Sequence, residues 1–192
     1  MNTPKDWVLR TLAVRANVVH DRSLHVGPGS VVWAPRRLEI GANVYIGKQV
    51  TVEVDGLIGD EVLFANGSGV VGKRDHNYEV VGVGVRSAPW VGEDESLSQQ
   101  TVIGSDVWVG FNAVVYSGLT VGNSSIIAAG SVVTADVPEN VIVAGVPARV
   151  IKDRFSASNF ERHWLVLSTK GVRRVPVGDE LLYKSRHGPG NR

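Results

Sequence analysis

The chain has 192 residues, 20 Lys and Arg against 19 Asp and Glu, a formal net charge of +1 and no cysteine. The missing cysteine excludes disulfides, thiolate-ligated zinc, iron–sulfur clusters and a cysteine nucleophile. The balanced charge argues against a dedicated nucleic-acid binder, and no uncharged apolar run is long enough to span a bilayer. Because the polar start Met1–Asp6 does not resemble a secretory signal, we expect a cytoplasmic protein.

Valine and glycine are unusually frequent, with 36 Val and 22 Gly. Valine is β-branched and favours strands, whereas glycine favours turns and close backbone approach. The composition therefore predicts short strands cut by frequent turns. We expect residues 1–25 to form an N-terminal segment and the regular strands to begin at Val26.

A large apolar residue recurs at every sixth position in two series, and Gly or Ala follows eight of these twelve residues. The twelve are Ile40, Ile46, Val52, Ile58, Phe64, Val70, Ile103, Val109, Val115, Val121, Ile127 and Val133. This period fits neither a helix nor an alternating strand, but it fits a strand plus a turn. Three units would close a coil of about 18 residues whose strands pair in parallel about 4.8 Å apart. Val26, Val32 and Leu38 predict an earlier coil, joined through a two-residue slip before Ile40.

The polar segment Lys73–Gln100 interrupts the repeat. Loops longer than about 12–15 residues in compact domains are usually functional or disordered. The stretch Lys73–Tyr78 holds the densest cluster of functional side chains in the chain, which favours ordered chemistry. Within it, His76 is the natural candidate for taking a proton near neutral pH, although a merely solvated loop histidine is the alternative.

Beyond Val133 the repeat ends, and residues 153–192 form a basic C-terminal segment. Ser158–Glu161 has the spacing of a capping box, which predicts a short helix that ends near Gly171 and buries one apolar face. We expect this helix to dock on one end of the repeat and cover an exposed edge. Residues Lys184–Arg192 are predicted to be disordered.

Three stretches carry a resemblance to a known family: Thr101–Gly110, Ile127–Thr134 and Ala144–Lys152. With the repeat, they resemble the hexapeptide-repeat acetyltransferases, especially the maltose, galactoside and polysaccharide O-acetyltransferase branch. The resemblance implies an all-β fold, a left-handed parallel β-helix over residues 26–152, with the inserted loop 73–100 and the short C-terminal helical segment. The left hand comes only from this resemblance, since parallel crossovers are usually right-handed.

The resemblance also implies a mechanism, in which His76 is the general base and an acceptor hydroxyl attacks the thioester of acetyl-CoA directly. No metal and no covalent acyl-enzyme are needed. Asp75 either orients the imidazole of His76 or is merely solvated. Trp90 either stacks on a sugar ring or anchors the loop.

For coenzyme A, the family uses a groove between two subunits of a homotrimer. The matching positions are Trp108, Gly110, Ala129, Thr134, Arg149 and Lys152. Arg149 and Lys152 match cations near the nucleotide phosphates, with surface solubility as the alternative reading. Two positions depart from the family pattern, Phe111 after Gly110 and Ala135 after Thr134.

The resemblance thus implies an acetyl-CoA-dependent O-acetyltransferase that modifies a sugar or a surface-polysaccharide precursor. Within the same class, the alternatives are an N-acetyltransferase of an amino-sugar nucleotide and a xenobiotic acetyltransferase. Outside it, the alternative is a β-helix scaffold or binding protein without catalysis. His76 in a long polar insertion argues against a pure scaffold.

Overall fold

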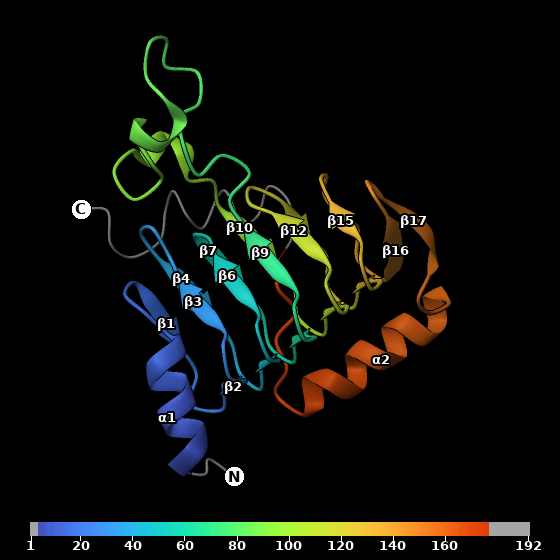
Figure 1. Ribbon diagram of the computed structural model, residues 1–192. Helices are drawn as coiled ribbons and strands as arrows, with labels where there is room; N and C mark the ends of the chain where they lie inside the picture. The colour runs from blue at the N-terminus through green and yellow to red at the C-terminus, as the bar shows by residue number, and fades with distance from the viewer. Residues whose placement is uncertain (1–3, 177–192) are drawn as a thin grey trace, which may run out of the picture.

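The structure, a computed structural model, describes residues 4–176 as a parallel β-helix (Figure 1). Three sheets run along it. Sheet A contains β3 (Val31–Trp33), β6 (Thr51–Glu53), β9 (Gly69–Val71), β12 (Val114–Tyr116) and β15 (Val132–Val133). Sheet B contains β1 (Val18–His20), β4 (Leu38–Ile40), β7 (Gly56–Ile58), β10 (Thr101–Ile103) and β13 (Thr120–Val121). Sheet C contains β2 (His25–Val26), β5 (Tyr45–Ile46), β8 (Leu63–Phe64), β11 (Trp108–Val109), β14 (Ile126–Ile127), β16 (Val141–Gly145) and β17 (Ala148–Asp153).

The core is a stack of apolar rungs, one from each sheet in every coil. All twelve residues of the predicted series point inward, and none is more than 4% exposed. In sheet B, for example, Ile58 lies between Ile40 and Ile103 in register. The predicted repeat is therefore confirmed, and each rung is stabilised by apolar burial on all sides.

The two-residue slip is also confirmed. Partners in neighbouring coils are 18 residues apart from Ile40 to Ile58, but 20 apart from Val32 to Val52. The earlier coil reaches further toward the N terminus than the expected boundary at Val26, because β1 already pairs with β4 in sheet B. Before it, helix α1 (Pro4–Ala13) lies against the first coil, an element that the sequence reading did not include (Figure 1).

The turns between sheets B and C use one recurring backbone conformation. The third residue after each inward residue has a positive φ, as in Asn43 (54°), Asp106 (58°) and Asn140 (60°). Short polar side chains tolerate this left-handed conformation better than apolar ones do, because they can bond to the local backbone. The polar positions of the repeat therefore mark its corners.

Helix α2 (Ala157–Thr169) follows the antiparallel β16–β17 hairpin that ends sheet C (Figure 1). Its N-cap is Ser156, two residues before the predicted capping Ser158, and Gly171 follows its end with a φ of +84°. Phe160 and Trp164 form its buried face. Neither helix in the described part of the chain is long and apolar enough to cross a membrane.

The predicted position of this helix at one end of the repeat is wrong. Helix α2 lies along the turns between sheets B and C, where both Arg154 Nη1 and His163 Nε2 lie 2.8 Å from Asp106 Oδ2. The physical reason is that these turns offer carboxylate and carbonyl acceptors to the basic segment, whereas the hairpin already pairs with the last strand of the coils. The prediction for Lys184–Arg192 falls outside the described residues.

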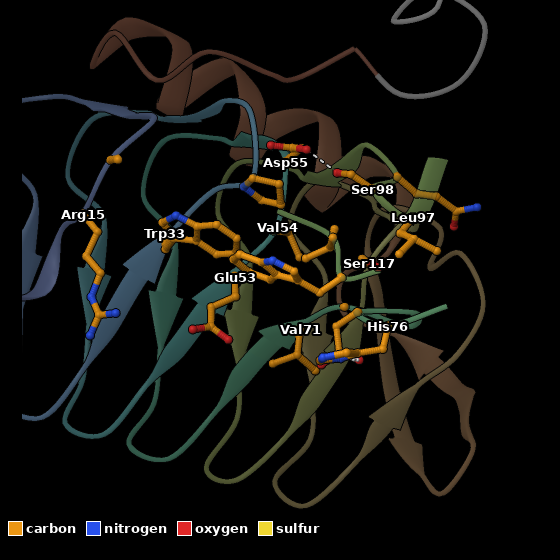
Figure 2. A pocket seen from close by; sticks show the side chains of 17 residues that line it. Arg15, Trp33, Glu53, Val54, Asp55, Val71, His76, Leu97, Ser98 and Ser117 are labelled. Atoms are coloured by element: carbon orange, nitrogen blue, oxygen red, sulfur yellow. Dashed lines mark hydrogen bonds and ion pairs between the residues drawn. The ribbon is translucent and has the colours of Figure 1, made fainter. Parts of the chain in front are cut away.

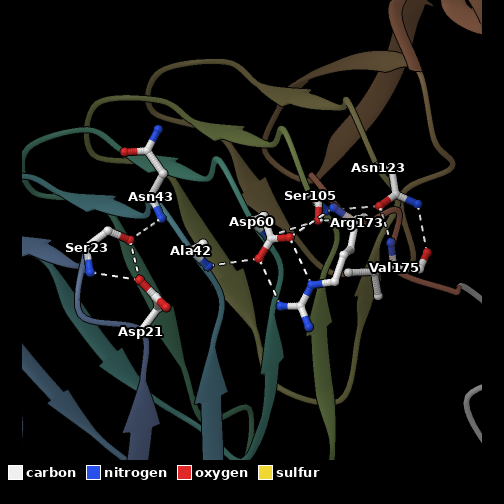
Figure 3. A network of polar contacts seen from close by, with 9 residues as sticks. All are labelled: Asp21, Ser23, Ala42, Asn43, Asp60, Ser105, Asn123, Arg173 and Val175. Carbon is white, nitrogen blue, oxygen red and sulfur yellow. Dashed lines mark hydrogen bonds and ion pairs between the residues drawn. The ribbon is translucent and has the colours of Figure 1, made fainter. Parts of the chain in front are cut away.

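Residues 172–176, which we call the strap, run back over the same turns (Figure 3). Arg173 donates to the Asp60 carboxylate from its backbone N, Nε and Nη2, at 2.9, 3.2 and 3.1 Å. Asn123 Nδ2 donates to Val175 O at 2.9 Å. Burial opposes ionisation of Asp60, but hydrogen bonds, chiefly from Arg173, outweigh it, so the pKa of this carboxyl lies below its ordinary value.

Candidate active site

A cleft with a volume of about 670 Å³ lies on sheet A beneath the inserted loop (Figure 2). Its floor comes from the outward side chains at the ends of β3, β6 and β9. Its roof comes from the insertion, which contributes Asp75, His76, Trp90 and residues 97–99. A cleft with apolar walls and a few polar groups is the usual form of a small-molecule site.

The floor is a row of side chains set by strand register. Val32 pairs with Val52, and Val52 with Val70, so the residue after each of them stands in one line across sheet A. From the N-terminal coil onward, this row reads Arg15, Trp33, Glu53, Val71, Tyr116 and Thr134. Neighbours in the row are about 4.8 Å apart, the spacing of paired strands. Figure 2 shows the first four in this order, with His76 at the Val71 end.

The insertion folds back on itself and holds His76 in place. His76 and Trp90 form an antiparallel bridge, in which Asn77 N donates to Pro89 O at 2.9 Å and Val91 N to Asp75 O at 2.8 Å. Two short 3-10 helices, η1 (Val85–Ser87) and η2 (Glu95–Leu97), complete the loop.

The insertion is also tied to the coils below it. Arg36 Nε donates to Glu95 at 3.1 Å, and the buried carboxylate of Asp55 accepts from Ser98 Oγ. Asp55 also accepts from the backbone N of Arg36 and Arg37, at 2.6 and 2.7 Å. The loop is therefore anchored at both its roof and its return to β10.

The imidazole of His76 is open to the cleft. Its side chain is 36% exposed, and its Nδ1 lies 3.6 Å from Asp75 Oδ1, longer than a hydrogen bond. No residue in the described part of the chain makes a hydrogen bond to the ring, so a ring nitrogen is free for a substrate proton. The Asp75 side chain is 73% exposed, so little of the surrounding structure holds it in a position to orient the imidazole of His76.

Trp90 packs on Trp33, with ring centroids 5.6 Å apart and an interplanar angle of 17°. Gly92 lies so close to the Trp90 ring that a Cβ on Gly92 would fall 2.3 Å from it. These are the contacts that Trp90 needs in order to anchor the loop, one of its two predicted roles. Because 40% of Trp90 stays exposed, part of the ring can still meet a bound acceptor.

The residues expected to bind coenzyme A fall into three groups on the chain. Thr134 continues the cleft row two strands beyond Val71. Gly110 and Ala129 lie at the turns between sheets C and A, where the coils touch so closely that a Cβ on Gly110 would fall 2.6 Å from Ala129 N. Only glycine fits at position 110.

The third group lies on sheet C, away from the cleft. Trp108 points outward and is 49% exposed, as strand alternation predicts. Arg149 and Lys152 are exposed on β17, at the edge of the same sheet. A single chain therefore brings Asp75, His76, Trp90 and Thr134 to one face, but Trp108, Arg149 and Lys152 to another.

Trp108 belongs to a continuous apolar and aromatic row on sheet C. In register, the row contains His25, Tyr45, Leu63, Trp108, Ile126 and Ile142. Tyr45 is 46% exposed and Leu63 is 40% exposed. Contiguous exposed apolar rows of this kind are typical of protein–protein interfaces.

The sequence reading missed the floor of the cleft. Arg15, Trp33 and Glu53 each follow an inward residue by one position, and they are 18 and 20 residues apart. Extending the six-residue register through the two-residue slip would have aligned them. Their nearness to His76 depends on the fold of the insertion, which no repeat encodes.

Known proteins with similar sequences include transferases and acetyltransferases. The family described as "Bacterial transferase hexapeptide (six repeats)" matches residues 100–135. Galactoside O-acetyltransferase of Escherichia coli (strain K12) is 32% identical over 139 residues, which cover 72% of this chain and 68% of that protein. A putative lipopolysaccharide biosynthesis O-acetyl transferase of the same strain is 47% identical over 55 residues, 29% of this chain and 28% of that protein.

Among solved structures, a hexapeptide-repeat-containing acetyltransferase from Vibrio cholerae O1 biovar eltor, complexed with acetyl coenzyme A, is similar in fold. The TM-score is 0.56 at 25% identity, with 78% of this chain and 76% of that chain covered. The stacked coils and the family match define a transferase built on a left-handed parallel β-helix. The chain belongs to the hexapeptide-repeat acetyltransferase family.

Proposed function

We propose that this acetyltransferase moves an acetyl group from acetyl-CoA to a hydroxyl of a sugar or a surface-polysaccharide precursor, with His76 as the general base. The observation that carries the proposal is the open imidazole of His76 in the cleft under the insertion. The likeness to a galactoside O-acetyltransferase and to a structure complexed with acetyl coenzyme A supports the acceptor class and the donor.

The transfer is direct. The acceptor hydroxyl gives its proton to a ring nitrogen of His76 while its oxygen attacks the carbonyl carbon of the thioester. When the tetrahedral intermediate collapses, the carbon–sulfur bond breaks and the proton on His76 passes to the leaving thiolate. The products are an acetyl ester, the free thiol of coenzyme A and a neutral imidazole.

The cleft row supports an order of the two substrates along sheet A. Thr134 lies on the C-terminal side of His76, where family likeness puts the donor. Trp33 and Glu53 lie on the N-terminal side, which leaves that half of the row to the acceptor. Holding both substrates in one row lowers the entropic cost of their encounter. A backbone N–H at a turn of the coils would stabilise the oxyanion.

We further propose a homotrimer with active sites between subunits. The apolar row on sheet C supports a contact with a second copy, since it leaves Tyr45, Leu63 and Trp108 exposed on one chain. Packing of this face beside the cleft of a neighbour would bring Trp108, Arg149 and Lys152 toward the donor. The two cations would then hold the phosphates of coenzyme A.

The test is release of thiol from acetyl-CoA with a panel of sugar and amino-sugar acceptors. The chain has no cysteine, so the protein adds no background to a thiol reagent. We expect His76→Ala to lower kcat by about 10²–10⁴-fold, the usual contribution of a general base. His20→Ala, a histidine on β1 outside the cleft lining, should keep wild-type rates.

Three results would count against the proposal. Thiol release by His76→Ala at the wild-type rate would exclude His76 as the general base. Transfer to amines in preference to hydroxyls would favour the N-acetyltransferase alternative. No transfer above hydrolysis with any acceptor would leave the chain as a family member without this activity.

A further inference from the structure

Two charged side chains on the cleft floor face it without a partner. In residues 4–176, neither the guanidinium of Arg15 nor the carboxylate of Glu53 makes a hydrogen bond or an ion pair, and both residues are exposed. Above them, Arg36 of the coils pairs with Glu95 of the loop, and Arg74 pairs with Glu79 within the loop, at 3.1 and 2.8 Å, whereas the exposed Asp75 carboxylate lies beside His76. Arg15 and Glu53 are thus the charged side chains that a ligand would meet on the floor of this cleft.

Register keeps the two charges apart. The bridge between Val14 and Val32, with Arg15 N donating to Val32 O at 2.9 Å, sets Arg15 beside Trp33. Trp33 pairs with Glu53 in turn, so Trp33 stands between Arg15 and Glu53 in the row. Figure 2 shows Arg15 at the end of the row away from His76. With three strand spacings between them, the backbone of Arg15 lies roughly 14 Å along the row from that of Val71, at the end where His76 lies.

This arrangement would select an acceptor by the position of its charge. A negative group at the reacting sugar would face Glu53, which repels it. A negative group one or more sugar units away would reach Arg15, whose planar fork binds a carboxylate or phosphate with two hydrogen bonds. The sugar between them would lie against Trp33, with its hydroxyls donating to Glu53.

We propose that the acceptor is an acidic saccharide of at least two sugar units, with its reacting hydroxyl at His76 and its distant carboxylate or phosphate bound by Arg15. This inference rests on the proposed function, because it takes the cleft to hold the acetyl acceptor. It assigns Arg15 and Glu53 as specificity-determining residues of the same site.

The test compares matched acceptors that differ only in charge. Neutral malto- and cello-trisaccharides are assayed beside their counterparts with a terminal carboxylate and with a terminal phosphate, which separates the two sources of charge. Binding is measured by isothermal titration with His76→Ala, and transfer by thiol release with the wild type. We expect at least one charged form to bind and react roughly tenfold or more better than its neutral parent, the size of a charge-assisted hydrogen bond.

Variants locate the effect. Arg15→Gln should remove the preference by raising KM for the charged acceptor to that of its neutral parent. Arg15→Lys should restore part of it, since the charge returns without the fork. The matched control is Arg162→Gln, an exposed arginine on α2 outside the cleft lining.

The outcomes separate this inference from the proposed function. Equal binding and transfer for charged and neutral forms, or a preference that survives Arg15→Gln, would overturn the inference alone. Arg15-dependent binding without any acetyl transfer would support Arg15 as the binding site of an acidic saccharide, but it would contradict the proposed function and the role of that saccharide as acceptor. Neither binding nor transfer with any saccharide would overturn both.

Discussion

The contacts between the strap and the carboxylate of Asp60 contribute to the free energy of unfolding. The carboxylate of Asp60 accepts from Arg173 N, Nε and Nη2 and from Ala42 N, the last at 2.8 Å, and its side chain is only 4% exposed. In Asp60→Asn, the new amide NH₂ would face one of these donors, so at least one buried N–H would lose its acceptor. Such a loss costs about 1–3 kcal/mol.

The ion pair between Asp60 and Arg173 adds less to the free energy of unfolding than its short distances suggest. The Arg173 side chain is 78% exposed, so solvent screens the ion pair and its share is about 1 kcal/mol or less. We therefore expect Asp60→Asn to lower the free energy of unfolding by about 1–4 kcal/mol at pH 7. Glu161→Gln, an exposed acid on α2, should change it by less than about 0.5 kcal/mol.

The pH dependence gives an independent check. The folded-state pKa of Asp60 is lowered, so its stabilising effect is full above the ordinary aspartate pKa of about 3.9 and is lost as pH falls through the folded value. Urea unfolding of wild type and Asp60→Asn, at one protein concentration, should show a gap at pH 7 that narrows below about pH 4. An equal gap at pH 7 and pH 3, or no gap at pH 7, would refute this account of the strap.

Two further changes probe the core and the sheet C face. Ile103→Ala removes a fully buried side chain between Ile58 and Val121 and should lower the free energy of unfolding in urea by about 2–5 kcal/mol. Ile103→Val should lower it by only about 0.5–1.5 kcal/mol. Equal losses for the two variants would mean that the coil closes around the gap. Trp108→Glu puts a charge into the apolar row, so it should shift the native mass from three times 20.6 kDa toward that of a monomer and should lower kcat. The control Val19→Glu, at a 53% exposed position on sheet B, should change neither the native mass nor kcat. A monomeric wild type, or a trimer that tolerates Trp108→Glu, would contradict the interface.

Much of the fold was predictable because the repeat is chemically uniform. Every inward position carries a large apolar residue at a constant spacing, so the period alone identifies the rungs. The slip before Ile40 was visible for the same reason, as a break in an otherwise regular count. The position of α2 was not predictable, because its partners, Asp106 among them, look like ordinary turn residues in sequence.

The candidate site was only partly predictable. His76 stood out because it lies in a polar insertion, and Asp75 and Trp90 because they share that insertion. Arg15 and Glu53 carried no such signal, being single charged residues next to inward valines. That the structure puts them in one row with His76 depends on strand pairing between residues far apart in the chain.

The coil, the inward face of each strand and the insertion that interrupts them depend on local period and composition, so they can be predicted from the amino-acid sequence. Which outward residues meet depends on the tertiary structure. Because of the insertion, the paired Ile58 and Ile103 are 45 positions apart in the sequence instead of 18, and the loop folds back over earlier coils. A cleft whose floor comes from strands and whose roof comes from a loop is therefore set by register and packing, which no single stretch of sequence contains.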